Sequence, residues 1–184
     1  MTNHARIILM GYMGSGKSYF GKALAQLLNL NFIDLDKYIE KKEKLSISSL
    51  FEQKGEVYFR KVETQYLKEV LNDHQYDIVA LGGGTACYGD NLEIIKSTDN
   101  MQTVYLQKSV LELSKTLYNE KSTRPMIAHF SNEEDFIEYI SKHLFERQYY
   151  YLQAAHKINL SNVDSNEDVI EKIKHILKNE SNEQ

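Results

Sequence analysis

The feature that most constrains this chain is a phosphate-binding loop near its N-terminus. Residues 11–18 read Gly-Tyr-Met-Gly-Ser-Gly-Lys-Ser, which is the pattern of a glycine, four residues and then Gly-Lys-Ser. The apolar run at residues 7–10 predicts a buried strand, and apolar residues at helical spacing over 19–28 predict a helix. A glycine-rich loop between a strand and a helix N-terminus suits polyphosphate binding through backbone N–H groups. We therefore expect the chain to bind a nucleoside triphosphate.

Several residues of this loop have predicted roles at the nucleotide. The Lys17 ammonium is expected to reach the outer phosphates, and the Ser18 hydroxyl is expected to ligate Mg2+. The glycines allow the backbone to approach the phosphates without side-chain clashes. The predicted nucleotide-binding residues of the loop are Gly14, Ser15, Gly16, Lys17, Ser18 and Tyr19.

Length and composition indicate one compact domain. A chain of 184 residues can bury a core, and its net charge of −4 without a basic stripe argues against nucleic acid as a partner. The single cysteine, Cys87, excludes a disulfide framework and indicates a reducing compartment. The polar N-terminus leaves no room for a signal peptide, and no apolar stretch is long enough for a membrane span. We expect a cytoplasmic monomer without membrane contact.

Short apolar runs alternate with helical patterns along the chain. The predicted strands cover residues 7–10, 32–35, 78–81, 103–106 and 158–160, and helical periodicity lies between and after them. This alternation predicts an α/β fold with a parallel sheet of about five strands and helices on both faces. Residues 1–184 form a single domain in this prediction, and the polar tail over 178–184 is expected to fray.

Asp34 and Asp36 follow at the carboxyl end of the second predicted strand. Residues two apart in an extended chain project to the same side, so both carboxylates are expected to face one way. Ligands bind at this edge of open α/β sheets. Two like charges side by side are unfavourable unless a cation or a donor-rich substrate lies between them. A solvated strand end with a helix cap is the alternative, but the nearby phosphate-binding loop favours metal and substrate roles.

Two loops add candidate binding residues. Gly82, Gly83 and Gly84 directly follow the third predicted strand and would let a ligand approach the backbone, although a tight turn is an equal alternative. Arg124 precedes the only proline of the chain, which breaks any helix and holds the arginine on a loop. A mobile loop with one arginine can bring positive charge to a transferred phosphate.

Two further arginines lie on predicted helices. Arg147 falls within the apolar stripe of its helix, so it either extends to solvent or meets a buried anion. Arg60 lies one turn before Glu63, which falls near the apolar face and could pair with it. A purely structural ion pair is an equal alternative for Arg60.

Taken together and in order, six motifs resemble those of shikimate kinases. They read GYMGSGKS, FIDLD, GEVYFRKVE, LGGG, TRP and FERQYYY, and the match runs from about residue 6 to about residue 160. The resemblance implies ATP-dependent phosphorylation of shikimate at its 3-hydroxyl, with ATP and Mg2+ as the nucleotide and the metal.

The resemblance also implies roles for residues around the transferred phosphate. Lys17 would contact the β- and γ-phosphates, and Ser18 would ligate Mg2+ with Asp34 in support. Asp36 would accept a hydrogen bond from the hydroxyl that is phosphorylated. Arg124 would belong to a lid and neutralise the transferred group. The implied catalytic residues are Lys17, Asp36 and Arg124.

On the substrate side, the resemblance implies a clamp for the carboxylate of shikimate. Arg60 and Arg147 would form this clamp, and Gly82, Gly83 and Gly84 would hold the hydroxyls. The implied fold is a nucleotide-kinase-like P-loop core with a helical substrate-binding segment over about 35–63 and a lid over about 117–130.

One departure from the family pattern concerns the adenine. The helix before the lid commonly supplies an arginine there, whereas this chain has Leu117 at that place and Lys115 nearby. Tyr19 replaces the usual small hydroxyl residue after Ser18, which we expect to be harmless.

Two other functions stay open on the sequence alone. Another small-molecule P-loop kinase, for gluconate or a nucleoside monophosphate, would share the loop, but the paired arginines with the glycine cluster suit a carboxylate. A nucleotide-binding module without turnover would not need intact Lys17, Ser18, Asp34 and Arg124 together.

Overall fold

A five-stranded parallel sheet forms the centre of the molecule, which confirms the predicted fold class. The computed structural model describes residues 5–120 and 125–179. The strand order is β2-β3-β1-β4-β5, and every neighbouring pair is parallel. The strands are β1 (Arg6–Met10), β2 (Phe32–Asp34), β3 (Ile78–Ala80), β4 (Met101–Gln107) and β5 (His156–Asn159). The fifth strand therefore starts and ends earlier than the predicted 158–160, because a 3-10 turn begins at Leu160.

Helices connect the strands, as the alternating pattern predicts. The sequence did not predict the two shortest ones, α4 and α6. The last helix ends at Asn179, so residues 178 and 179 of the predicted tail are helical. The rest of that tail, residues 180–184, lies outside the described residues. The described helices are α1 (Lys17–Leu28), α2 (Leu35–Glu43), α3 (Ile47–Asn72), α4 (Asn91–Lys96), α5 (Val110–Glu120), α6 (Pro125–Ala128), α7 (Glu133–Tyr151) and α8 (Asn166–Asn179).

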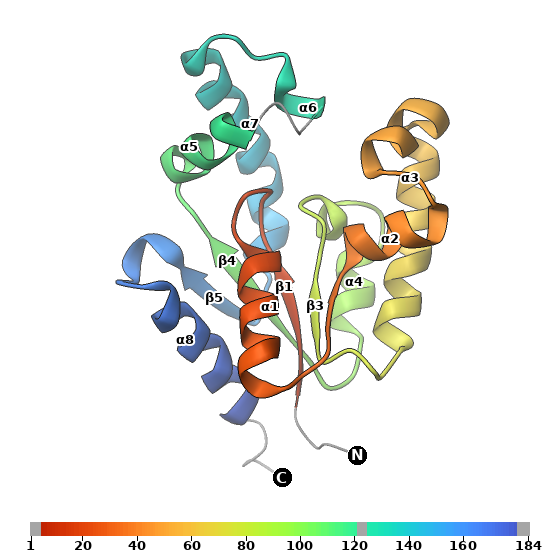
Figure 1. Cartoon of the computed structure of the whole chain (residues 1–184), viewed down its shortest axis with the longest axis vertical. Helices are drawn as coiled ribbons and strands as arrows, with labels where there is room; N and C mark the ends of the chain where they lie inside the picture. The colour runs from red at the N-terminus through yellow and green to blue at the C-terminus, as the bar shows by residue number, and fades with distance from the viewer. Residues whose placement is uncertain (1–4, 121–124, 180–184) are drawn as a thin grey trace.

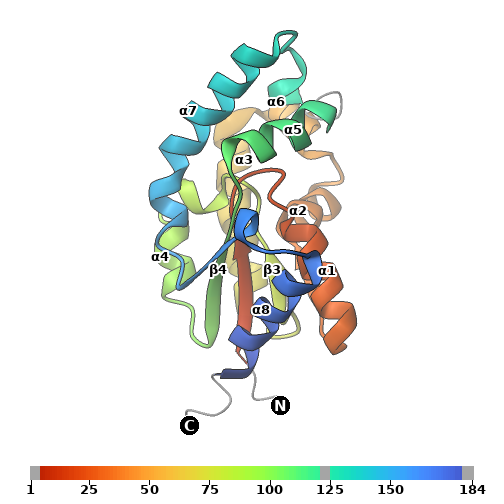
Figure 2. The same ribbon diagram turned by 90° about the vertical axis from the view of Figure 1, so that its left-hand side faces the viewer.

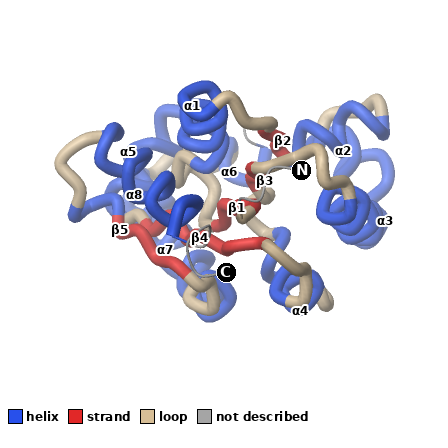
Figure 3. Tube along the Cα trace, turned by 90° about the horizontal axis from the view of Figure 1, so that it is seen from below, coloured by secondary structure: helices blue, strands red, loops and turns tan. Residues whose placement is uncertain are grey.

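Alternate residues of β1 face two separate helical layers. Ile7 and Leu9 belong to an apolar cluster with residues of α1 and α8, whereas Ile8 and Met10 belong to a cluster with residues of α3, α4 and α7. Figures 2 and 3 show α1 and α4 on opposite sides of the sheet. Because both faces are covered, the central strands β1 and β3 are fully buried and almost wholly apolar.

The register of the strands places three loops at one edge of the sheet. Leu9 of β1 and Asp34 of β2 both pair with Ala80 of β3. The phosphate-binding loop, the start of α2 and the glycine cluster therefore begin at nearly the same level. Above this edge, α2 and the tip of α3 rise on one side, and α5, α6 and the upper part of α7 rise on the other (Figure 1).

A bend divides α3 near its N-terminal end. Gly55 has φ 80° and ψ 167°, a conformation that L side chains rarely adopt, and nothing lies within 4 Å of an added Cβ. The backbone conformation, not lack of space, therefore requires glycine. The segment before the bend carries Phe51 and the segment after it carries Phe59, and the centres of the two rings lie 4.5 Å apart. None of the described helices has the length and apolar character of a membrane span.

Candidate active site

The phosphate-binding loop curls around the side chain of Lys17. The Lys17 Nζ donates hydrogen bonds to the carbonyls of Gly11 (2.8 Å) and Tyr12 (2.9 Å), and the residue is buried. Gly14 (φ 77°) and Gly16 (φ 93°) adopt the left-handed conformation that the tight turn requires. Helix α1 then begins at Lys17, so its N-terminus faces the hollow of the loop.

Ser18 and Asp34 bring two hard oxygen ligands together beside the loop. The Ser18 hydroxyl donates a hydrogen bond to Asp34 Oδ2, and Asp34 Oδ1 accepts from the backbone N–H of Lys37 (3.2 Å). Asp34 is thus the N-cap of α2 as well as the partner of Ser18. A hydroxyl and a carboxylate at a phosphate site are donors that Mg2+ prefers, so the residues fit this ion.

The predicted geometry of Asp36 is wrong. The two carboxylates were expected on one side of an extended strand, but β2 ends at Asp34 and Asp36 lies in the first turn of α2. The reason is that Asp34 caps a helix, which ends the extended backbone one residue before Leu35. Asp36 remains in the site, because its Oδ1 lies only 2.6 Å from where a Cβ on Gly82 would stand.

The surroundings of Asp36 change the pKa of its carboxyl group. Burial raises the pKa of the Asp36 carboxyl to about 7, and the charges of Asp34 and Glu63 contribute to this rise while Lys17 opposes it. A carboxyl with a pKa near neutral pH can accept a proton from a substrate hydroxyl and release it again.

A cavity of about 480 Å³ opens next to the loop and suits a nucleotide. Of the predicted nucleotide-binding residues of the loop, Ser15 is the exception, since its side chain is fully buried and does not line this cavity. Leu117 does not line it either, because its side chain packs against Gly14, and the neighbouring Thr116 faces the cavity instead. Sequence reasoning missed part of the lining, namely Lys108, Thr116, Glu120 and Asn166.

A second cavity of about 530 Å³ collects all of the predicted substrate-binding residues. Arg60 comes from α3 and Arg147 from α7, yet both line this cavity with Asp36. The glycines Gly82, Gly83 and Gly84 line it as well. Sequence reasoning missed the aromatic and imidazole part of the lining, which is Tyr12, Phe51, Phe59 and His143.

The two cavities share one boundary. Four residues line both of them, namely Met13, Asp34, Asp36 and Gly83. A group bound to the phosphate loop and a molecule in the second cavity would therefore meet at Asp34 and Asp36. This arrangement is suited to transfer of a phosphoryl group between two bound molecules.

Both arginines of the second cavity are largely withdrawn from solvent. Arg60 Nη1 donates to Glu63 Oε2 (2.8 Å), as the helical spacing predicted, and its guanidinium lies 3.5 Å from the centre of the Tyr88 ring. Arg147 Nη1 donates to the carbonyl of His143 (3.1 Å). The side chains of the two arginines are 19% and 12% exposed, respectively. Two guanidinium groups in one partly enclosed cavity favour an anionic ligand.

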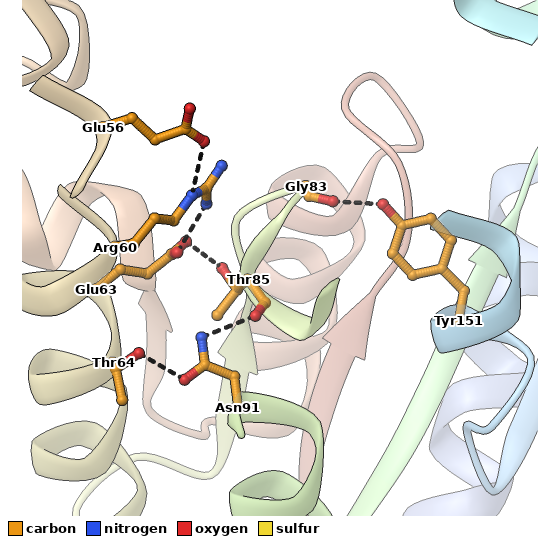
Figure 4. A network of polar contacts seen from close by, with 8 residues as sticks. All are labelled: Glu56, Arg60, Glu63, Thr64, Gly83, Thr85, Asn91 and Tyr151. Atoms are coloured by element: carbon orange, nitrogen blue, oxygen red, sulfur yellow. Dashed lines mark hydrogen bonds and ion pairs between the residues drawn. The ribbon is translucent and has the colours of Figure 1, made fainter. Parts of the chain in front are cut away.

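A network of buried polar groups fixes the glycine cluster and Arg60 relative to one another (Figure 4). Glu63, which is 1% exposed, accepts hydrogen bonds from Arg60 and from Thr85 Oγ1 (2.7 Å). Asn91 donates to the carbonyl of Thr85 (2.9 Å), and the Tyr151 hydroxyl donates to the carbonyl of Gly83. Apart from the spacing of Glu63, nothing in the sequence marks these residues as part of the site.

The structure describes only part of the predicted lid. Arg124 lies outside the described residues. On either side of the gap, Leu117 and Ile127 are fully buried, and the centre of the Phe130 ring lies 4.9 Å from that of Tyr139. The described ends of the segment 117–130 are thus anchored by more apolar contact than the sequence pattern indicated.

Comparisons with known proteins agree with this geometry. A sequence model of the shikimate kinase family matches residues 13–178. The shikimate kinase of Flavobacterium johnsoniae is 43% identical over 164 residues, which are 89% of this chain and 94% of that protein.

Solved structures of shikimate kinases have the same fold. The enzyme from Bacteroides thetaiotaomicron superimposes with a TM-score of 0.82 at 32% identity, over 95% of this chain and 98% of that one. The enzyme from Acinetobacter baumannii, solved in complex with shikimate, has a TM-score of 0.81 at 32% identity, over 98% and 96% of the two chains. Because the family match spans most of the sequence, this chain belongs to the shikimate kinase family.

Proposed function

We propose that this protein transfers the γ-phosphoryl group of ATP to the 3-hydroxyl of shikimate and releases shikimate 3-phosphate and ADP. The observation that carries the proposal is the pair of cavities that meet at Asp34 and Asp36. One is built around a phosphate-binding loop and the other around two arginines. Membership of the shikimate kinase family supports the same reaction.

The acid end of the substrate is assigned to the arginine side of the second cavity. Arg60 and Arg147 can each offer two parallel N–H groups to a carboxylate, which an ammonium cannot do. We assign the ring hydroxyls to the backbone of Gly82, Gly83 and Gly84, which line the same cavity. Phe51 and Phe59 add an apolar wall for the carbon ring.

We assign to Asp36 the role of accepting the proton of the 3-hydroxyl. The hydroxyl oxygen forms a bond to the γ-phosphorus, its proton passes to the Asp36 carboxylate, and the bond to the departing ADP oxygen breaks. Lys17, which the carbonyls of Gly11 and Tyr12 hold inside the loop, stabilises the charge that develops on the phosphates. Positioning and charge neutralisation supply most of the catalysis in this scheme.

Ser18 and Asp34 would hold Mg2+, directly or through water. Bound by these two residues, the ion would supply positive charge that offsets the negative charge of the phosphates. Arg124 would add charge from the lid. The proposal also includes a monomer in the cytoplasm, and size-exclusion chromatography with light scattering tests the monomer.

A coupled assay of ADP release tests the reaction. Shikimate, gluconate and AMP are offered side by side with ATP and Mg2+. We expect turnover with shikimate and only background ADP release with the other two. Equal or greater turnover with gluconate or AMP would overturn the assignment of the substrate, and no turnover with any of them would indicate a binding module.

A further inference from the structure

His143 is a cavity residue that the proposed reaction does not use. It lies on α7 one turn before Arg147 and lines the cavity of about 530 Å³. Its ring stacks on Tyr139 (5.2 Å between centres, 18° between planes) and meets the edge of Tyr12 (5.5 Å, 78°). Two aromatic neighbours therefore hold the imidazole in one orientation at the arginine side of the cavity.

The contact with Tyr12 favours one tautomer of His143. The Tyr12 hydroxyl lies 2.5 Å from His143 Nδ1 and has no other hydrogen-bond partner among residues 5–120 and 125–179. Burial raises the pKa of Tyr12, so the phenol keeps its proton. Donation of this proton to Nδ1 satisfies both groups and leaves the ring proton on Nε2.

His143 is also neutral at physiological pH. Burial and the charge of Arg147 lower its pKa to about 4. In the described part of the chain, the Nε2 atom of His143 has no hydrogen-bond partner and is not fully buried. A neutral N–H donor is thus available in a cavity where two arginines already supply positive charge.

We propose that His143 is a further substrate-binding residue, whose Nε2–H donates a hydrogen bond to the carboxylate of the substrate beside Arg147. The inference rests on the proposed function and deepens it. A hydrogen bond from a neutral donor orients the carboxylate without adding a third cation to the cavity. It also disfavours ligands that place an apolar group there, because the N–H would then be left unpaired.

Two substitutions separate the two nitrogens of the ring. His143→Asn keeps an amide near the position of Nδ1, where it can still pair with Tyr12, and removes the donor at Nε2. His143→Gln places an amide N–H near the position of Nε2. We expect His143→Asn to raise the KM for shikimate ~10-fold. Its kcat and its KM for ATP should stay within about two-fold of wild type. We expect His143→Gln to recover part of the lost affinity for shikimate. His175→Asn on α8, far along the chain from the cavity residues, is the matched control.

Nuclear magnetic resonance of histidine-labelled wild-type protein tests the inference without a substitution. The His143 ring is recognised as one that does not titrate above pH ~5, in keeping with its lowered pKa. We expect the tautomer with the proton on Nε2 and a change in the Nε2 resonance when shikimate is added. The Nδ1-protonated tautomer, or an Nε2 resonance that ignores saturating shikimate, would overturn the inference.

The kinetic outcomes separate this inference from the proposed function. A wild-type protein that turns over shikimate, together with a His143→Asn variant whose KM is unchanged, overturns the role of His143 alone. The role of His143 is equally overturned if His143→Gln is as impaired as His143→Asn, because the residue would then act by packing. A wild-type protein that ignores shikimate overturns both.

Discussion

The two cavities of the site are built in different ways. The nucleotide side takes seven of its fifteen lining residues from one continuous segment, 13–20, which is the phosphate-binding loop and the first turn of α1. The acid side, by which we mean the second cavity with Arg60 and Arg147, is assembled from distant segments. It takes Asp36 from α2, Arg60 from α3, the glycines from the loop after β3 and Arg147 from α7. One is local in the sequence and the other depends on tertiary packing.

This difference has a consequence for how each side tolerates change. The nucleotide side is held by local backbone conformation and by the start of one helix. The acid side is held by buried polar contacts such as those of Glu63 with Arg60 and Thr85. Substitutions in that network should therefore weaken shikimate binding and leave nucleotide binding intact.

Arg124 tests whether the two described cavities suffice for catalysis. It lies outside the described residues. We expect Arg124→Ala to lower turnover by ~10³-fold with a much smaller effect on shikimate affinity, if it neutralises the transferred group as arginine fingers do. Steady-state kinetics and calorimetry measure the two effects. A variant with nearly normal turnover would mean that the two cavities alone carry the reaction.

The arginine clamp tests the acid side directly. We expect Arg60→Lys and Arg147→Lys each to weaken shikimate binding by ~2–4 kcal/mol, because an ammonium cannot replace the bidentate guanidinium at a partly buried carboxylate. ADP binding should stay nearly unchanged. Calorimetric titrations with each ligand measure both, and unchanged shikimate affinity in both variants would contradict the clamp.

Asp36 tests the boundary that the two cavities share. Asp36→Asn keeps the size of the side chain and removes the proton acceptor, so we expect turnover to fall at least ~100-fold. Binding of ADP should persist, because the phosphate-binding loop does not depend on this carboxylate. Turnover within a few-fold of wild type would show that another group accepts the proton.

The same residue gives a prediction for stability against pH. The pKa of Asp36 is raised to about 7 in the folded protein, so the folded state holds this proton more tightly than the unfolded state. Its contribution to stability is fully present below pH ~4 and is lost as pH rises to ~7. We compare the free energy of unfolding of Asp36→Asn with that of wild type at two pH values. We expect this difference to shift in favour of the variant by on the order of 2 kcal/mol when the pH rises from ~4.5 to ~8. Urea unfolding at the two pH values measures this, and an equal difference at both would contradict the raised pKa.

Glu63 tests the supporting network, with Glu56 as a matched control. Both are glutamates that contact Arg60, but Glu63 is buried and Glu56 is 54% exposed. We expect Glu63→Gln to weaken shikimate binding ~10-fold, since the pairing charge is lost from a buried position, and Glu56→Gln to change it less than about two-fold. ADP affinity should be unchanged in both. Equal effects of the two substitutions would mean that burial does not determine the strength of this support.

The described ends of the lid differ from what the sequence pattern predicts. The pattern over residues 117–130 indicated little apolar surface, yet Leu117 and Ile127 are fully buried. The partners of Leu117 include the phosphate-binding loop, since its side chain packs on Gly14. A linear pattern does not reveal such contacts, because the partner lies far away in the sequence.

The sequence by itself determined the parallel α/β architecture and the phosphate-binding loop. Alternating apolar runs and helical periodicity arise from burial on both faces of a sheet, and the loop pattern depends on local backbone conformation. The ion pair of Arg60 with Glu63 was predictable for a similar reason, because i, i+3 neighbours on a helix are close in any fold.

Tertiary structure alone decided how the acid side is assembled and tuned. The end of β2 at Asp34 follows from a helix cap that competes with the extended chain, and this places Asp36 against Gly82. The Tyr12–His143 contact joins residues 131 positions apart. Burial then raises the pKa of Asp36 and lowers that of His143, and burial depends on which segments the folded chain packs around each group.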